Sequence, residues 1–122
     1  MNSKNIFGEP IVTCSTAPMT GYFRDGCCNT DETDYGEHTV CVIVTDVFLE
    51  FSKAQGNDLS TSRPEYGFQG LVSGDSWCLC ATRFLEAYTS GAAPKVRLEA
   101  TNEECLNTIE MDILIACAHR TV

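Results

Sequence analysis

A run of apolar and β-branched residues near the middle of the chain predicts a buried strand. Residues 39–44 read Thr-Val-Cys-Val-Ile-Val, a short hydrophobic run of the kind that buried strands have. We expect a helix directly after it, because Thr45 or Asp46 can cap a first turn and Gly56 suits a C-terminal stop. The apolar stripe of this helix is predicted to consist of Val47, Phe48, Phe51 and Ala54.

The segment that begins at Asp75 fits two patterns. As a strand, residues 77–80 would place Cys78 and Cys80 on one face, because side chains alternate along a strand. As a helix capped by Asp75, the segment gains an apolar stripe at helical spacing. That stripe consists of Trp77, Cys80, Ala81, Phe84, Leu85 and Tyr88. More positions fit the helix, so we predict a helix that Gly91 and Pro94 bring to an end.

The C-terminal part of the chain predicts one more strand and two short helices. Residues 95–100 alternate between polar and apolar side chains, which indicates a half-exposed strand. Thr101 and Glu104 match a capping box for a short helix, and a last helix is expected over Met111, Leu114, Ile115 and Ala118. We therefore predict an α+β fold for residues 1–122 as a single domain, with three to four helices packed mainly on one face of a small sheet.

Two long irregular segments, residues 14–37 and 56–75, separate these elements and suggest a binding site. The second exceeds the usual loop limit of about 12–15 residues, and such loops are commonly functional. We expect the two segments to meet around a polar-rimmed pocket for a small molecule or a protein partner. The candidate binding residues are Arg24, Asp25, Asn57, Asp58 and Trp77. The alternative is that the polar side chains only satisfy the backbone of turns.

The charge of the chain excludes some classes of partner. Its 122 residues include 8 Lys and Arg against 17 Asp and Glu, which gives a net charge of -9. Nucleic acids and anionic membranes are bound by clustered basic residues, so neither is an expected partner. Residues 1–10 lack the pattern of an export signal, and residues 40–44 form the longest apolar run, far short of the roughly 20 residues that span a bilayer. We expect a soluble cytoplasmic protein.

Eight cysteines set the chain apart. In the cytosol these thiols would stay reduced, so export-type disulfides are not expected. Cys41, Cys105 and Cys117 fit core positions. The remaining cysteines, with a nearby histidine, are the candidates for a zinc or thiol site: Cys14, Cys27, Cys28, His38, Cys78 and Cys80. No C-x2-C pair occurs among them, so zinc remains a weak expectation.

The candidate chemistry leaves three classes of function open. A thiol nucleophile would need a histidine base or a basic neighbour, and the chain offers His38, His119 and Arg24. The adjacent Cys27 and Cys28 suggest a redox switch through a ring disulfide. We favour a small-molecule or partner-binding module over a thiol- or zinc-dependent enzyme, and keep as a third alternative a structural or interaction domain whose cysteines fill the core.

Acidic residues gather in the first irregular segment and suggest calcium. They are Asp25, Asp31, Glu32, Asp34 and Glu37. A calcium loop starting at Asp31 would need a glutamate where the chain has Val42. The segment is therefore expected to be a solvated acidic loop.

Several stretches of the chain resemble one bacterial family. They are GEPIVTCSTAPMTGYFRDGCCNT, GEHTVCVIVTDVFLEFSKAQGNDLST, YGFQGL, GDSWCLCATRFLEAY and APKVRLEAT, and they resemble the proteins grouped as domain of unknown function 2237. The family pattern has prolines at the positions of Ser62 and Gln69 and a tryptophan at that of Phe84. The resemblance implies a small cytoplasmic α+β domain, and it transfers no catalytic residue because the family carries no established activity.

Overall fold

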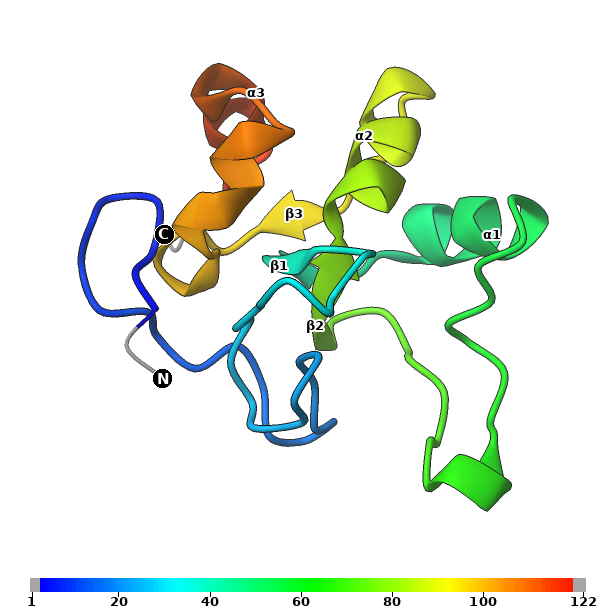
Figure 1. Cartoon of the computed structure of the whole chain (residues 1–122). Coiled ribbons are helices and arrows are strands. Elements are labelled where there is room, and N and C mark those ends of the chain that lie inside the picture. The colour runs from blue at the N-terminus through cyan, green and yellow to red at the C-terminus, as the bar shows by residue number, and fades with distance from the viewer. Residues whose placement is uncertain (1–2, 120–122) are drawn as a thin grey trace.

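The computed structural model describes residues 3–119, which form a mixed α/β fold around a three-stranded antiparallel sheet (Figure 1). Strand β1 (His38–Ile43) lies in the centre, between β2 (Ser76–Cys80) and β3 (Lys95–Val96). The prediction of a buried strand at this place is confirmed, because the middle four residues of β1 are buried. Both long irregular segments extend below the sheet in Figure 1, blue to cyan for the first and green for the second.

Three α-helices and three short 3-10 helices make up the other elements of the described residues. The α-helices are α1 (Asp46–Ala54), α2 (Ala81–Thr89) and α3 (Met111–Ala116). The 3-10 helices span Pro64–Tyr66, Leu98–Ala100 and Glu103–Asn107. Helix α2 packs against α1 and against both β1 and β2, so it bridges the sheet and the neighbouring helix. Among the described residues, no helix is long and apolar enough to span a membrane.

Helix α1 begins as predicted but buries a different stripe. The Thr45 hydroxyl accepts a hydrogen bond from the Phe48 amide at 3.1 Å and caps the helix. Its buried residues are Phe48, Leu49 and Ser52. Val47 is 63% exposed, so its predicted place in the apolar stripe is wrong. The helix is rotated so that Ser52 faces inward, where its hydroxyl donates to the Asn57 carbonyl at 2.7 Å.

The segment around Trp77 is a strand, and the prediction of a helix there is wrong. Strand β2 pairs with β1 from Ser76 opposite Ile43 to Cys80 opposite His38, with a bulge between His38 and Val40. The apolar stripe that favoured a helix is real only from Ala81 onward, where α2 begins. Pairing with the buried central strand gives the backbone of β2 hydrogen-bond partners, and this tertiary gain outweighs the local pattern, which favours a helix.

The predicted strand over residues 95–100 is shorter than expected. Only Lys95 and Val96 pair with β1, and a 3-10 helix follows. The Thr101 hydroxyl accepts a hydrogen bond from the Cys41 amide of β1 at 3.2 Å. This side chain takes the place that a backbone carbonyl of a longer β3 would have had. Thr101 is therefore not the cap of the next helix, because the Asn102 side chain takes that role by accepting from the Glu104 amide.

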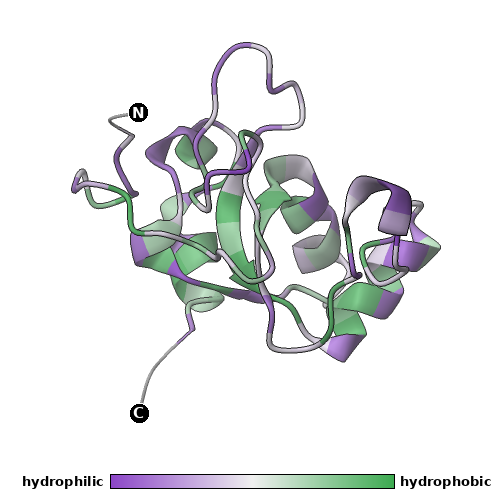
Figure 2. Ribbon diagram, turned by 90° about the horizontal axis from the view of Figure 1, so that it is seen from below, coloured by the Kyte–Doolittle hydropathy of each residue, from purple (hydrophilic) through white to green (hydrophobic). Residues whose placement is uncertain are grey.

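The core divides into a larger part of aliphatic and aromatic side chains and a smaller, cysteine-rich part. In Figure 2 the strands and the inward faces of the helices are the most hydrophobic regions, and the long loops are mostly polar. The larger part includes the fully buried side chains of Phe48, Phe84 and Leu114. The second part consists of Cys14, Cys28, Cys41, Cys78 and Ala100. It fixes the first irregular segment to the face of the sheet.

Candidate functional site

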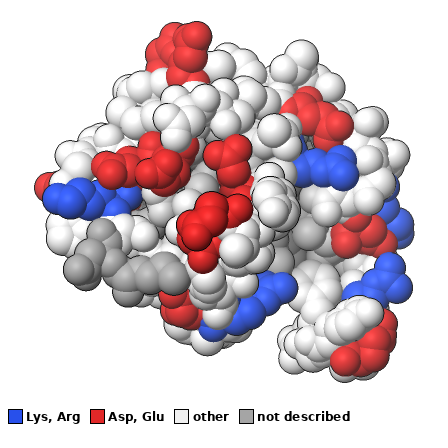
Figure 3. Space-filling model, viewed as in Figure 1, with Lys and Arg blue, Asp and Glu red and all other residues white. Residues whose placement is uncertain are grey.

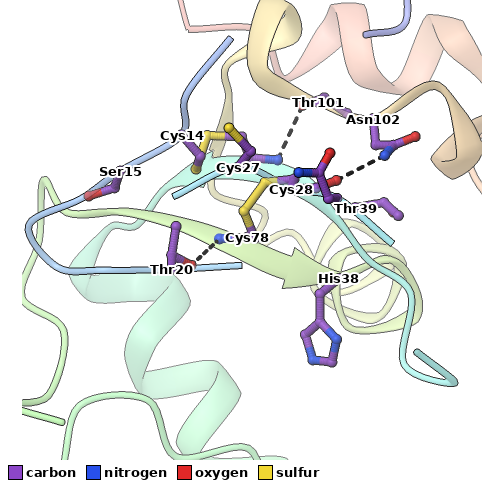
Figure 4. Close-up of a disulfide and its surroundings, with 12 residues drawn as sticks. Cys14, Ser15, Thr20, Cys27, Cys28, His38, Thr39, Cys78, Thr101 and Asn102 are labelled. Atoms are coloured by element: carbon purple, nitrogen blue, oxygen red, sulfur yellow. Dashed lines mark hydrogen bonds between the residues drawn. A yellow bond between two sulfur atoms is a disulfide. The ribbon is translucent and has the colours of Figure 1, made fainter. Parts of the chain in front are cut away.

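Two buried disulfides join the first irregular segment to the sheet (Figure 4). One links Cys14 to Cys41 of β1, and the other links Cys28 to Cys78 of β2. All four residues are at most 4% exposed. The expectation that every thiol stays reduced is therefore wrong for these four. Cys41 is buried as predicted, but as a disulfide partner rather than as a free core thiol.

The cysteines that remain free are Cys27, Cys80, Cys105 and Cys117. The predicted ring disulfide between Cys27 and Cys28 is thus absent, because Cys28 pairs with Cys78 and Cys27 keeps its thiol. Cys105 is a fully buried core residue, as predicted, whereas Cys117 is only half-buried.

Three sulfurs of the cysteine cluster are close enough to hold a metal ion. The Sγ atoms of Cys14, Cys28 and Cys78 all lie within 4.8 Å of one another. Zinc binds thiolates, so these sulfurs would be ligands only after the two disulfides are reduced. Cys27, His38 and Cys80 are not part of this group.

Buried polar side chains hold the segment against the strands that carry these disulfides. The Thr20 hydroxyl accepts from the Cys78 amide at 2.9 Å, and the Asn102 amide donates to the Cys28 carbonyl at 3.0 Å. Figure 4 shows both bonds beside the Cys28–Cys78 disulfide. Because unpaired buried backbone groups are costly, these bonds fix β2 and the first irregular segment in one arrangement.

A cavity of about 330 Å³ opens where both irregular segments approach β2. Such a volume suits a small ligand. The first segment contributes Thr20, Gly21, Tyr22 and Arg24, and the second contributes Asn57 and Leu59. Residues 77–80 of β2, His38 of β1 and Arg83 of α2 complete the lining. A second cavity, lined by residues 16–19, 67–70, Val72 and Asp75, has no cysteine, histidine, lysine or arginine.

The first cavity is lined by two arginines, although the protein as a whole is acidic. The Arg24 guanidinium stands 5.3 Å from the centre of the Trp77 ring, a cation–π arrangement. Arg83 donates to the Gln55 carbonyl at 3.1 Å and pairs with Glu86 at 3.3 Å. In the described part of the chain the ion pairs do not include Arg24. On the face shown in Figure 3, by contrast, carboxylate side chains are spread widely and basic side chains lie singly or in small groups.

Three of the five candidate binding residues line this cavity, and two do not. The lining includes Arg24, Asn57 and Trp77, but not Asp25 or Asp58.

The two aspartates outside the cavity bind within their own segments. The Asp25 carboxylate accepts hydrogen bonds from the Cys27 amide and from the Asn29 side chain. The carboxylate of Asp58 caps its own turn, and a hydrogen bond from Thr61 lowers its pKa to about 2. The carboxylates of Asp25 and Asp58 therefore accept hydrogen bonds from residues of their own turns. The alternative interpretation of the irregular segments predicts this role.

A buried carboxylate orients the histidine of the cavity. His38 Nδ1 lies 2.7 Å from Asp34 Oδ1, and the side chain of Asp34 is 0% exposed against 40% for His38. Asp34 also accepts from the His38 amide and from the Thr30 hydroxyl, each at 2.9 Å. A carboxylate can only accept, so Nδ1 carries the hydrogen and Nε2 is left as the acceptor. Asp34 is thus an exception to the predicted solvated acidic loop.

Two neighbouring residues also affect the position of the imidazole. The ring of Tyr22 stacks on it, with 6.2 Å between centroids and 18° between planes. A Cβ atom at Gly36 would stand only 2.8 Å from His38 Cε1, so the glycine leaves room for the ring. The orientation of His38 is therefore set by packing as well as by Asp34.

The free thiol of Cys80 lies opposite His38 at the start of a helix. The two residues are cross-strand partners in β1 and β2, and directly opposed residues have Cβ atoms about 4.5–5.5 Å apart. Cys80 is the N-cap of α2, where its Sγ lies 3.2 Å from the Thr82 hydroxyl. No side chain caps this helix, and Cys80 and Arg83 line the cavity, so the positive end of the helix dipole lies beside it.

The buried thiol of Cys105 predicts a pH dependence of stability. Burial raises its pKa to about 12, and the charge of Glu37 adds to the shift. The folded protein therefore holds this proton more tightly than the unfolded chain, whose thiols titrate near pH 8.5. Stabilisation by this group is complete below about pH 8.5 and is lost as the pH rises toward 12, by up to about 1.4 kcal/mol per pH unit. Urea unfolding of the native protein and of Cys105→Ala between pH 8 and 10.5 measures this, and identical pH dependence in both would contradict it.

These observations define a small mixed α/β protein with two buried disulfides and one basic, thiol-containing cavity. The chain belongs to the family described as an uncharacterised protein conserved in bacteria, domain of unknown function 2237, whose model matches residues 4–118. The resemblance found in the sequence is thereby confirmed. A comparison with curated proteins gives no match.

Sequence reasoning missed the residues that organise the cavity. Asp34 was counted among solvated acids, although its spacing of four residues from His38 is a signal that the two can meet. Arg83 lies on the polar side of the predicted helix, where nothing in the sequence indicates that it lines a cavity. The pairing of His38 with Cys80 had no local signal, since it depends on the strand register.

Proposed function

We propose that the protein is a binding module for a small anionic molecule, which it holds in the cavity beside β2. The single observation that carries this proposal is the convergence of Arg24, Arg83 and His38 on one cavity of a protein with net charge -9. Guanidinium groups bind carboxylates and phosphates with paired, charge-assisted hydrogen bonds. The rest of the surface repels anions, so a local basic site is the place where one can bind.

The contacts of these residues support a preformed site. Trp77 is 8% exposed and packs between Phe68, at 5.5 Å, and the Arg24 guanidinium. Arg24 has a positive φ of 56°, which is uncommon outside glycine and recurs at ligand-binding positions. This backbone conformation has a cost in free energy, and the Arg24 guanidinium lies over the Trp77 indole. An anion there would meet the Arg24 guanidinium and the side-chain amide of Asn57.

Fluorescence of Trp77 tests the proposal, because it is the only tryptophan in the chain. Titration with inorganic phosphate, acetate and citrate is expected to change its emission saturably, whereas glycerol and choline leave it unchanged. Arg24→Gln should weaken binding roughly tenfold or more, the value of one charge-assisted hydrogen bond. Arg63→Gln is the matched control, since Arg63 is exposed and outside the cavity. Equal responses to anions and to neutral solutes, or equal effects of the two variants, would contradict anion binding.

We also propose the cytoplasm as the place of action. Thiol–disulfide exchange requires access to a sulfur atom, and the four bonded cysteines are nearly or fully buried. Burial of this degree supports the persistence of both disulfides against small cytosolic thiols.

A further inference from the structure

We propose that Cys80 is a nucleophilic thiol, with His38 as its base, that accepts the acyl group of a small anionic ester or thioester. The inference rests on the proposed anion site, because Arg24 and Arg83 would hold the charged end of the substrate. It adds a reaction to that site. The juxtaposition that carries it is a free thiol, an oriented imidazole and a buried carboxylate, all at one cavity.

The arrangement brings together the groups that an activated nucleophile uses. A nucleophile needs a base within reach, and that base needs a third group to orient it. Cys80 faces His38 across the strand pair, and Asp34 holds His38 Nδ1 at 2.7 Å. The second nitrogen, Nε2, is then free to accept the proton of the thiol. Asp34 acts through His38 and is a positioning residue.

The first turn of α2 supplies donors for the charge that develops on the substrate. The first backbone amides of a helix lack partners within it, and here the Ala81 amide donates instead to the Glu37 carbonyl at 3.0 Å. The amides of Thr82 and Arg83 come next in this first turn and have no capping side chain. Donors of this kind stabilise the oxyanion formed when a nucleophile adds to a carbonyl.

The proposed reaction balances without a redox partner. The Cys80 thiol gives its proton to His38 Nε2, and Sγ bonds to the acyl carbon. The bond from that carbon to the leaving oxygen or sulfur breaks, and the leaving group takes the proton from His38. Water then adds to the thioester, gives one proton to His38 and releases the acid, and that proton returns to Sγ. The net reaction is hydrolysis.

The test uses two activated esters, 4-nitrophenyl acetate and the 4-nitrophenyl monoester of succinic acid, which carries a free carboxylate. We expect both to release nitrophenolate in a burst and to leave an acyl group on Cys80, located by peptide mass spectrometry. The succinate ester should react at least about tenfold faster because of the arginines. Cys80→Ser should abolish the burst, and His38→Gln should slow it by about a hundredfold, the usual contribution of a general base.

Cys27→Ala is the matched control, because Cys27 is also a free, half-buried cysteine but lies outside the cavity. It should leave the burst unchanged, and circular dichroism shows whether each variant is folded. An unreactive Cys80 in a protein whose Trp77 still responds to phosphate overturns this proposal and leaves the anion site standing. Acylation of Cys80 at equal rates by both esters, with no response of Trp77 to anions, overturns the anionic substrate class and the proposed function together.

Discussion

Replacing Cys28 and Cys78 together by alanine is expected to lower the free energy of unfolding by about 4 kcal/mol. Their disulfide closes a loop across a sequence separation of 50 residues, and the chain-entropy treatment assigns about that value to a loop of this length. The loss is large against a total stability of about 5–15 kcal/mol. Urea unfolding of both proteins without reducing agent measures the difference.

The double variant Cys27→Ala, Cys80→Ala is the matched control for this prediction. It removes two cysteines that stand next to the disulfide in sequence but are both free, so it should cost much less. A thiol count on the denatured, unreduced protein should give four thiols. Eight thiols, or equal stability losses in the two variants, would contradict the disulfides. If zinc then restored the stability of the fully reduced protein, the cluster of Cys14, Cys28 and Cys78 would be a metal site.

Removing the buried carboxylate of Asp34 is expected to have the second largest effect. Asp34→Ala should lower the free energy of unfolding by about 3 kcal/mol, because hydrogen bonds to a buried charged group are worth about 1.5–3 kcal/mol each and their donors would be left unpaired. Those donors are the His38 amide, His38 Nδ1 and the Thr30 hydroxyl. Chemical denaturation gives the stability, and the imidazole nitrogen resonances of His38 show whether the hydrogen still resides on Nδ1.

The control for this substitution is Asp31→Ala in the same acidic segment. Asp31 accepts from the amide and hydroxyl of Thr33, which lowers its pKa, but it is exposed. Its removal should cost less than about 1 kcal/mol and leave the His38 tautomer unchanged. Equal effects of the two substitutions would show that Asp34 has no special part in orienting the histidine.

The local sequence predicts an element well where its hydrophobic pattern fits only one type of secondary structure. Residues 39–44 are apolar on both faces, and Thr45 precedes a helical run with its cap in place. The segment after Asp75 fits both a strand and a helix, and its local pattern favours the helix, which is wrong for residues 76–80. Pairing with β1 decided it, and that pairing depends on a segment more than thirty residues away.

Some features of the cavity can likewise be predicted from local sequence, and others depend on contacts between distant segments. Loop length and polarity drew attention to Arg24, Asn57 and Trp77, which line it. The disulfide pairing could not be predicted, because eight cysteines allow 105 connectivities even when all of them are paired. Spacing alone selects none of these, and it does not show that four cysteines stay free. The alignment of Cys80 with His38 was likewise hidden, since a shift of register by one residue would turn the two side chains to opposite faces.

The most direct test of the account is a two-dimensional NMR titration of the native protein with inorganic phosphate. We predict that the Arg24 Nε–H, the Trp77 indole N–H and the His38 imidazole resonances shift together along one saturable curve, with the Thr82 and Arg83 amides following. The Arg63 side chain should stay unchanged. Shifts that are absent from these groups, that do not saturate, or that spread over all basic side chains alike would contradict an anion site in the cavity beside β2.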